Sequence, residues 1–392
     1  MKNFTKKLKT VWWRIKSIAV RYYYGNPSKK LKIVGVTGTN GKTTTATLLY
    51  RITIALGYKT GLISTVENII VDERRGATMT TPDSVTLTKL FAEMVKKGCE
   101  YVFMEVSSHA LDQRRVAGIS FVGGIFTNLT HDHLDYHKNF NNYFVAKKKF
   151  FEMLPKYAFA LSNIDDKYGL KMLEGIKAKK YTYGFKNKAD FSEQLNTKLL
   201  GDFNTYNALA VYASAILLGQ NKEKVKEILK NVEPPKGRLE HFTSKNGVLI
   251  IVDYAHSPDA LEKVLLTVRE IKKPNSKIIS VFGCGGDRDP LKRPIMGKLG
   301  AKLSDIAIFT SDNPRGEDPD AIIGQMKTDL SVEDLKKAKT ISNRHEAILE
   351  AVKIAHKDDI ILCAGKGHED YQEIKGVKHR FDDMEELKKA FQ

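Results

Sequence analysis

A strand, a glycine-rich turn and a helix follow one another between residues 32 and 45, where the chain reads KIVGVTGTNGKTTT. The β-branched run at 33–36 is typical of a buried parallel strand. The turn at 38–41 contains two glycines, and the apolar helix that follows begins at Lys42. Such a sequence directs consecutive backbone N–H groups and a helix N-terminus at an anion. It therefore predicts an α/β fold with a phosphate-binding loop.

The residue types in this loop favour a nucleoside triphosphate. Lys42 is placed to reach the outer phosphates, and the Thr43 hydroxyl is placed to bind Mg²⁺. The general P-loop pattern has glycine where Val36 stands, so this loop is a variant with its tight turn at Gly38. An ordinary βα turn is the alternative interpretation. The predicted ATP contacts in this loop are Gly38, Thr39, Asn40, Gly41, Lys42, Thr43 and Thr44.

Composition and charge limit the remaining function classes. Charged residues make up 28% of the chain and hydrophobic residues 42%, which is typical of a globular protein and not of a disordered one. The net charge of +18 suits anionic partners, and phosphorylated small molecules satisfy it as well as nucleic acid does. No pattern of aromatic residues and arginines typical of a nucleic-acid reader is present, so we expect no nucleic-acid partner. Three widely spaced cysteines favour a reducing compartment.

Alternating apolar runs and helical stretches predict two α/β domains. In the first, strands are expected at 33–36, 101–106, 123–127 and 158–162, in a parallel sheet with helices on both faces. In the second, they are expected at 248–252, 277–282, 306–309 and 360–363. Paired prolines at 234 and 235 mark the linker. We therefore predict a central P-loop-type ATPase domain at 31–235 and a Rossmann-like domain at 236–392.

The first thirty residues form a segment of different character. They contain nine lysines and arginines, no acidic residue, and a cluster of aromatic and aliphatic side chains from Trp12 to Tyr24. The segment is too short and too charged to cross a bilayer, but it is suited to lie on an anionic membrane face. The alternative, which we prefer, is a helix that packs its aromatic side onto the following domain.

Three segments after the P-loop carry residues suited to a phosphate and metal site. Glu105 ends a predicted strand, where a Mg²⁺ ligand is expected, and residues 126–135 follow another strand end. A lysine run at 147–149 lies on a predicted helix. Taken singly, these are a surface acid, surface histidines and a solvated helix face. Zinc is an alternative for the histidines at 131, 133 and 137, but hard oxygen neighbours favour magnesium.

The order of motifs resembles the Mur ligases, and most closely their MurE type. The resemblance rests on GTNGKTTT, TTPDS, MEVSSHALDQRRV, TNLTHDHLDYH and YFVAKKKFF, and it extends from about residue 25 to 372. These enzymes form amide bonds in cell-wall precursors at the expense of ATP. The family usually has a further domain of about a hundred residues before the P-loop strand, so the resemblance implies that 1–30 is a reduced N-terminal domain.

The resemblance also implies roles for individual residues. Two Mg²⁺ ions are expected, with Thr43, Glu105, His133 and Lys147 as ligands, and Lys147 falls on the lysine that the family carbamylates with CO₂. The implied catalytic residues are Lys42, His133, Lys147 and Arg238. The implied contacts to a UDP-MurNAc-dipeptide are Thr80, Thr81, Ser107, Gln113 and Arg115. Further implied ATP contacts are Asn204, Asn207, Asp253 and His256.

The C-terminal domain is expected to choose the amino acid. The DNPR sequence at 312–315 resembles the signature of family members that use meso-diaminopimelate in place of L-lysine. Diaminopimelate has a second carboxylate that lysine lacks, and paired arginines suit a carboxylate. A simple Asn-Pro turn is the alternative. The implied contacts to diaminopimelate are Arg288, Asp312, Asn313, Arg315, Gly365 and Glu369.

We therefore expect a cytoplasmic, monomeric ligase that adds meso-diaminopimelate to UDP-N-acetylmuramoyl-L-alanyl-D-glutamate through an acyl phosphate. One alternative is a related ligase with another acceptor, of folylpolyglutamate or cyanophycin type, although TTPDS, DNPR and GKGHEDYQ argue against it. The other alternative is a non-catalytic ATP-binding scaffold held at a membrane by the basic N-terminus.

Overall fold

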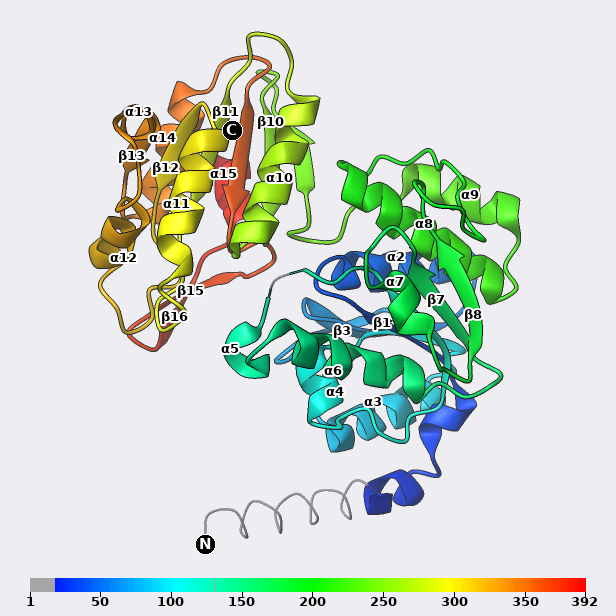
Figure 1. Ribbon diagram of the computed structural model, residues 1–392. Helices are drawn as coiled ribbons and strands as arrows, with labels where there is room; N and C mark the ends of the chain where they lie inside the picture. Colours follow the sequence, from blue (N-terminus) through cyan, green and yellow to red (C-terminus); the bar gives the residue numbers. More distant parts are fainter. Residues whose placement is uncertain (1–17, 131) are drawn as a thin grey trace, which may run out of the picture. The chain divides into compact units, whose positions relative to one another are not determined.

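The computed structural model describes residues 18–130 and 132–392, which form two compact units (Figure 1). The first unit contains the described residues up to Lys198 together with Phe203–Val232, and the second contains Leu199–Asp202 and Glu233–Gln392. The second part of unit 2 begins one residue before the paired prolines. The helix that precedes the prolines ends at Asn231, as expected because a proline and the residue before it disfavour helix continuation. The three predicted domain ranges stay a prediction.

Unit 1 contains an eight-stranded sheet in the order β4-β3-β2-β5-β1-β6-β7-β8, with β1 in its interior. Six neighbouring strands from β2 to β8 are parallel, which confirms the expected α/β class. The strands are β1 (Lys32–Thr37), β2 (Thr60–Ile63), β3 (Glu67–Ile70), β4 (Glu73–Gly76), β5 (Tyr101–Glu105), β6 (Phe121–Phe126), β7 (Phe159–Asn163) and β8 (Lys179–Tyr183).

The parallel sheet has an antiparallel extension at one edge that was not predicted. Strands β3 and β4 are antiparallel to their neighbours and form a hairpin extension. All four residues of β4 are exposed, so the strand has no buried face and no apolar alternation that would mark it in the sequence. Charged side chains at such an edge are a common protection against unwanted strand pairing.

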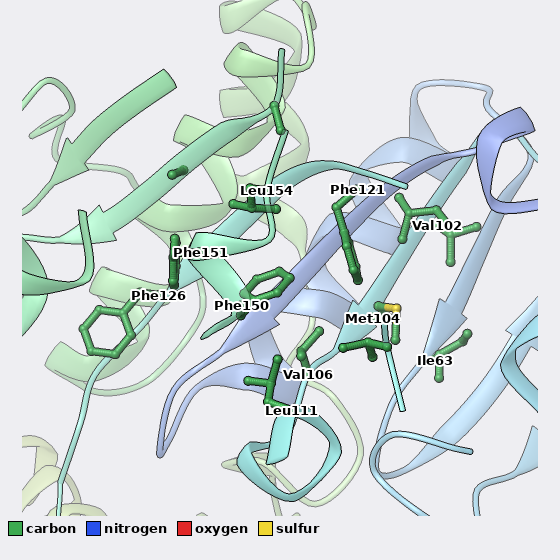
Figure 2. Packing of buried hydrophobic residues seen from close by; sticks show 14 of the residues in the cluster. Ile63, Val102, Met104, Val106, Leu111, Phe121, Phe126, Phe150, Phe151 and Leu154 are labelled. Atoms are coloured by element: carbon green, nitrogen blue, oxygen red, sulfur yellow. The ribbon is translucent and has the colours of Figure 1, made fainter. Parts of the chain in front are cut away.

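Helices cover both faces of this sheet. One large apolar cluster joins Ile33, Val102 and Met104 of the strands to side chains of α3, α4, α6 and α7. Figure 2 shows part of this cluster, including Leu111 of α4 and Phe150 of α6. Helix α2 packs against β1, β2 and β5 and contacts α9. The helical segments of unit 1 are η1 (Pro27–Lys30), α2 (Lys42–Ala55), α3 (Ser84–Lys96), α4 (Ser108–Asp112), α5 (Leu134–His137), α6 (Phe140–Glu152), α7 (Gly169–Leu173), α8 (Asp202–Leu217) and α9 (Lys222–Asn231).

Unit 2 contains a six-stranded sheet in the order β13-β12-β11-β14-β10-β9, which is parallel except for the edge strand β9. A separate hairpin is formed by β15 and β16. The strands are β9 (Glu240–Thr243), β10 (Leu249–Asp253), β11 (Ile278–Phe282), β12 (Ile306–Phe309), β13 (Ala338–Thr340), β14 (Ile360–Ala364), β15 (Tyr371–Ile374) and β16 (Val377–Arg380).

Helices α14 and α15 bury one face of the second sheet, where Ile348 and Leu387 join Ile250 and Val281 in one apolar cluster. Helices α10 and α11 pack against each other. The helices of unit 2 are α10 (Pro258–Ile271), α11 (Lys292–Leu303), α12 (Pro319–Met326), α13 (Val332–Lys337), α14 (Arg344–Ile354) and α15 (Asp383–Ala390).

At the start of the described chain, the expected packing of aromatic side chains onto the domain is not observed. Residues 18–23 are helical, but Tyr22 and Tyr23 have exposed fractions of 73% and 84%, so these rings do not pack onto the domain. Arg21 holds the segment by donating to the Ala117 carbonyl at 2.9 Å. The tryptophans at 12 and 13 lie outside the described residues, and membrane contact stays a prediction. Within 18–130 and 132–392, no helix has the length and apolar character needed to span a bilayer.

Candidate active site

The glycine-rich loop lies between β1 and α2, as predicted. Gly41 immediately precedes α2 with φ 83°, a backbone conformation that favours glycine, and no side chain caps the helix. A Cβ on Gly41 would press on the Asn207 amide, and one on Gly38 would collide with Thr127. Thr43 and Thr44 are buried in the first turn of α2. The loop therefore follows a path that only glycine permits at two positions.

Residues that follow β6 hold the loop in place. The Thr39 amide donates to the Asn128 carbonyl at 2.8 Å, and the Asn40 amide donates to Asn128 Oδ1 at 2.9 Å. The Thr127 hydroxyl donates to the Asn40 carbonyl at 2.6 Å. Our sequence analysis did not assign these two residues a role in the loop. The sequence feature that could have indicated this role is TNLT, which directly follows β6, a neighbour of β1 in the sheet.

Two lysines distant in sequence converge on this loop. Lys42 Nζ donates to the carbonyls of Gly38 at 3.0 Å and Thr39 at 2.8 Å, and Lys147 Nζ donates to the Gly38 carbonyl at 2.6 Å. Lys147 is 1% exposed and lies against the Tyr143 ring. Burial, together with the charge of Lys42, holds the pKa of Lys147 well below its ordinary value. Lys147 is thus a buried amine at the P-loop, on the side of α6 that faces it.

Glu105 lies at the carboxyl end of β5, beside β1. The register pairs it with Val36, and its side chain is fully buried. Its carboxylate accepts hydrogen bonds from the Thr65 amide at 2.7 Å and the Thr65 hydroxyl at 3.2 Å. Thr65 lies between β2 and β3, and nothing in our sequence analysis singled it out. A buried carboxylate next to the phosphate loop is well placed for a hard cation.

The histidine segment lies close to the two lysines at the loop, whose charges act on His133. His133 has a positive φ of 54°, and its ring lies 5.0 Å from that of His109. Desolvation lowers the pKa of His133 to about 4 despite the opposing charge of Asp132, so the imidazole is neutral. His137 is buried, and its Nε2 lies 2.9 Å from the Ser108 hydroxyl. Position 131 lies outside the described residues. Among the described residues no group of three or more His, Cys, Asp or Glu side chains is arranged to hold a metal.

The residues predicted to meet the UDP-dipeptide form a connected surface beside Glu105. The Thr81 hydroxyl donates to the Glu105 carbonyl at 2.9 Å and contacts Ser107 Oγ at 3.3 Å. Arg115 donates to the Thr81 carbonyl at 2.7 Å and to Gln113 Oε1 at 2.6 Å. Thr80 joins the group through Thr65 at 3.0 Å. The structure brings all five predicted residues together.

Asn204 and Asn207 lie on α8, and both are buried. They hydrogen-bond to each other at 2.9 Å, and Asn207 Oδ1 accepts from Thr45 of α2 at 3.5 Å. Helix α8 is thereby fixed against the helix that begins at the P-loop. A plain helix N-terminus with asparagine caps, the alternative to an ATP contact, does not account for these contacts, since both residues lie within α8.

In unit 2, the residues predicted to face ATP cluster around Tyr254. The Arg238 guanidinium lies 4.8 Å above the Tyr254 ring, and His256 Nδ1 is 2.8 Å from the Tyr254 carbonyl. Asp253 accepts a hydrogen bond from the Leu239 amide at 2.8 Å. Burial raises the pKa of Asp253 to about 6, although Arg238 opposes the shift. These residues form one group; their contact with a nucleotide stays a prediction.

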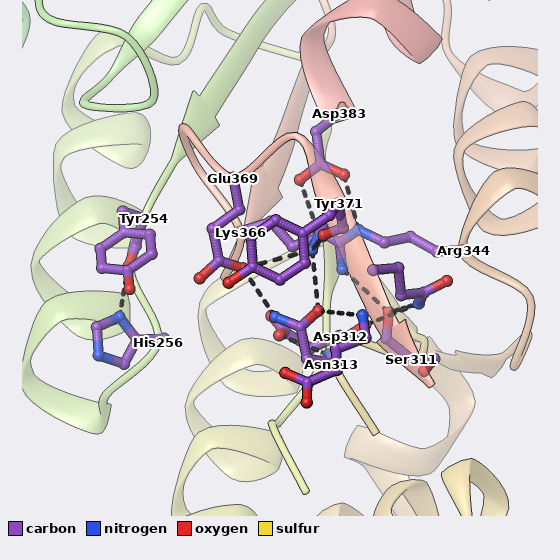
Figure 3. Close-up of polar contacts among 12 residues, drawn as sticks. Tyr254, His256, Ser311, Asp312, Asn313, Arg344, Lys366, Glu369, Tyr371 and Asp383 are labelled. Atoms are coloured by element: carbon purple, nitrogen blue, oxygen red, sulfur yellow. Dashed lines mark hydrogen bonds and ion pairs between the residues drawn. The ribbon is translucent and has the colours of Figure 1, made fainter. Parts of the chain in front are cut away.

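The DNPR segment follows β12 and meets the loop after β14 (Figure 3). Asn313 Nδ2 donates to Glu369 Oε2 at 2.7 Å, and Asn313 Oδ1 accepts from the Glu373 amide at 2.8 Å. Asp312 is buried, and a Cβ on Gly365 would press on its carboxylate at 2.5 Å. The segment is therefore part of a built polar site and not a simple turn.

The two predicted arginines flank the same site. Arg315 Nη1 donates to the Gly286 carbonyl at 2.8 Å, and its Nε lies 3.5 Å from Glu373 Oε2. Arg288 is exposed, and its side chain and that of Arg315 both approach Gly285. The side chains of both arginines thus start from loops next to Asn313, which agrees with the carboxylate-binding hypothesis.

A buried ion pair supports the site from within unit 2. Arg344 and Asp383 are both 0% exposed and make two contacts of 2.7 Å. Arg344 also donates to the carbonyls of Ala364 at 3.0 Å and Ser311 at 3.4 Å, which lie at the ends of the two site-forming segments (Figure 3). The pair joins α14 and α15 to both segments.

Comparison with known proteins identifies the family. The chain matches the Mur ligase middle domain at residues 36–215 and the Mur ligase glutamate ligase domain at 237–367. It is 54% identical over 378 residues to the UDP-N-acetylmuramoyl-L-alanyl-D-glutamate--2,6-diaminopimelate ligase of Cytophaga hutchinsonii, covering 92% of this chain and 78% of that protein. The chain belongs to the Mur ligase family.

Other Mur ligase relatives agree with this assignment. The protein of the same name from Bacteroides thetaiotaomicron is 51% identical, with 94% of this chain and 80% of that protein covered. A solved ligase of that name matches with a TM-score of 0.66 at 33% identity, over 92% of this chain and 78% of that one. A Mycobacterium tuberculosis folylpolyglutamate synthase shares the fold with a TM-score of 0.71 at 16% identity, over 90% of this chain and 92% of that one.

Proposed function

We infer that this Mur ligase joins meso-diaminopimelate to UDP-N-acetylmuramoyl-L-alanyl-D-glutamate, with ATP cleaved to ADP and phosphate. The observation that carries the inference is the 54% identity over 92% of the chain with a ligase named for this reaction. The described DNPR site agrees with it, because Asn313, Glu369 and Arg315 are gathered in one place. A folylpolyglutamate-type activity is not favoured, since the similarity there is one of fold.

The reaction requires an activated carboxylate. The γ-phosphoryl group of ATP passes to the D-glutamyl carboxylate, the amine of diaminopimelate attacks the acyl phosphate, and phosphate leaves as the amide forms. Lys42 neutralises phosphate charge at the loop, and the surface that contains Arg115 and Thr81 orients the anionic UDP-dipeptide. The chain therefore acts mainly by binding and orienting its substrates.

The residues present fit Mg²⁺. Glu105 would hold the ion with a buried carboxylate, and the Thr43 hydroxyl and the neutral His133 imidazole would add further ligand atoms. The ion would neutralise charge on the transferred phosphoryl group. We also propose that two Mg²⁺ ions bind and that a carbamate on Lys147 is one of their ligands. The support for the carbamate is that Lys147 is a buried amine with a lowered pKa, and only an unprotonated amine reacts with CO₂.

Cytoplasmic placement is proposed on separate grounds. Cys99, Cys284 and Cys363 are free and buried, as expected for a protein of a reducing compartment. That the ligase is a monomer also stays a proposal.

The function is tested by measuring phosphate release with ATP, Mg²⁺, the UDP-dipeptide and meso-diaminopimelate, with the tripeptide product identified by mass. L-lysine in place of diaminopimelate, and omission of each substrate in turn, are the controls. We expect release that depends on all components. No release above background would contradict the proposed function.

Replacing Arg315 by alanine is expected to raise the KM for diaminopimelate by about ten- to hundredfold, because a charge-assisted contact to its second carboxylate is lost. The preference over L-lysine, which lacks that carboxylate, should fall by a similar factor. Steady-state kinetics with both amino acids measure this. Arg380→Ala, which removes an exposed arginine paired with Glu385, is the matched control. An unchanged preference would exclude Arg315 from amino-acid selection.

A further inference from the structure

Lys366 is a completely buried lysine inside the amino-acid site, and neither the sequence analysis nor the mechanism uses it. It lies between Gly365 and Gly367 just after β14, with an exposed fraction of 0%. Its Nζ lies 3.3 Å from Asn313 Oδ1 and 3.4 Å from Glu369 Oε2, and it donates to the Tyr371 carbonyl. A buried ammonium is strongly unfavourable unless its charge and donors are satisfied. All three contacts belong to this site.

These contacts fix Asn313 and Glu369 relative to each other (Figure 3). Glu369 Oε2 receives hydrogen bonds from both Lys366 and Asn313 Nδ2. Asn313 Oδ1 accepts hydrogen bonds from Lys366 Nζ and from the backbone amide of Glu373. These contacts determine the orientation of the Asn313 side-chain amide. Two side chains predicted to contact diaminopimelate are therefore locked by one lysine.

Lys366 also sets the charge of the site. The carboxylate of the buried Asp312 acts on the partly buried Glu369, and within the described chain the lysine in contact with Glu369 is Lys366. Burial and Asp312 raise the pKa of Glu369, whereas Lys366 and Asn313 lower it.

Two further titratable groups near Glu369 are neutral, because burial raises the pKa of Tyr254 to about 12 and lowers that of His368 to about 3. The Tyr371 ring also lies close to Lys366. Lys366 thus offsets part of the negative charge of the Glu369 carboxylate, and the ammonium group of an amino acid can offset more of it.

We propose that Lys366 is a positioning residue of the amino-acid site, which holds Glu369 as an oriented carboxylate for the ammonium group at the second centre of diaminopimelate. This role rests on the proposed function. Without the lysine charge, burial and the neighbouring Asp312 raise the pKa of Glu369 further, and its carboxylate takes up a proton more readily. Glu369 then loses its attraction for the ammonium group. The effect falls on amino-acid binding and not on ATP or the dipeptide.

The test compares Lys366→Met with the wild-type protein. We expect the KM for diaminopimelate at pH 7 to rise by about tenfold or more, with the KM values for ATP and the UDP-dipeptide within about twofold. The ratio of variant to wild-type KM should fall as the pH rises from 6 to 9, because Glu369 ionises again. Adding Glu369→Gln to Lys366→Met should remove this pH dependence. Lys339→Met, which breaks an exposed pair with Glu350, is the control.

The outcomes separate this proposal from the proposed function. A wild-type protein without diaminopimelate-dependent phosphate release contradicts the function itself. If the wild type is active, two results overturn the role of Lys366. In one, the Lys366→Met variant keeps the wild-type KM for diaminopimelate. In the other, the KM values for all three substrates rise and kcat falls to a similar extent at every pH. Lys366→Gln retains a donor for the Tyr371 carbonyl and is used if the methionine variant does not fold. Failure of both variants to fold would assign Lys366 to stability alone and also overturn it.

Discussion

Lys147→Ala is expected to lower kcat for phosphate release by about a hundredfold or more, while the protein remains folded. The lysine is 1% exposed and lies at the Gly38 carbonyl, so its loss removes the proposed carbamate from the P-loop. Lys147→Arg should be equally inactive, because a guanidinium does not form this carbamate. Single-turnover and steady-state phosphate assays measure both variants.

Lys148 offers a matched control one position along α6. Its amine donates to the carbonyls of Lys171 and Glu174 at 2.6 Å and of Met172 at 3.0 Å, away from the loop. Lys148→Ala should therefore reduce stability slightly and leave kcat within about threefold. The wild-type protein should lose activity when CO₂ and bicarbonate are removed, and regain it when they return. An active Lys147→Arg protein would contradict the carbamate.

Breaking the Arg344–Asp383 pair should produce the largest loss of stability. Arg344→Met leaves the Asp383 carboxylate buried without its partner, at a cost of about 3–5 kcal/mol in the free energy of unfolding. For a unit of this size the melting temperature should fall by roughly 10 °C. Urea and thermal denaturation, followed by circular dichroism, measure the change.

The double variant Arg344→Met/Asp383→Leu separates charge burial from packing. Because it removes both charges, it should be more stable than either single variant. Since Arg344 also holds the carbonyls of Ser311 and Ala364, the double variant should still bind diaminopimelate more weakly than the wild type. Equal stability of the single and double variants would show that the pair does not act through its charges.

Strong local patterns predicted the central strands well. The β-branched run at 33–36 became β1, and 306–309 matches β12 in full, because buried parallel strands are continuous apolar runs. The edge strands β4 and β16 were not predicted. All their residues are exposed, so their sequences, ERRG and VKHR, contain no hydrophobic periodicity.

The site was predictable where one segment contains the chemistry, and not where partners come from elsewhere. Lys42, Glu105 and Arg315 follow from their motifs. Thr65, which holds Glu105, lies in a loop of ordinary composition 40 positions earlier, and no local signal marks it. Lys366 stood inside a recognised motif, but only the fold shows that it is buried against Asn313 and Glu369.

The bracing of the nucleotide loop has a consequence for synthesis of the chain on the ribosome. The loop at 38–41 is translated early, yet its supports are Asn128, Lys147, which lies 109 positions after Gly38, and Asn207. Closing such long loops is slow compared with forming local structure. Until residue 207 has left the ribosome, the nascent chain has no finished nucleotide site and cannot be stabilised by its own substrate. The segment that begins the fold is therefore among the last to become functional.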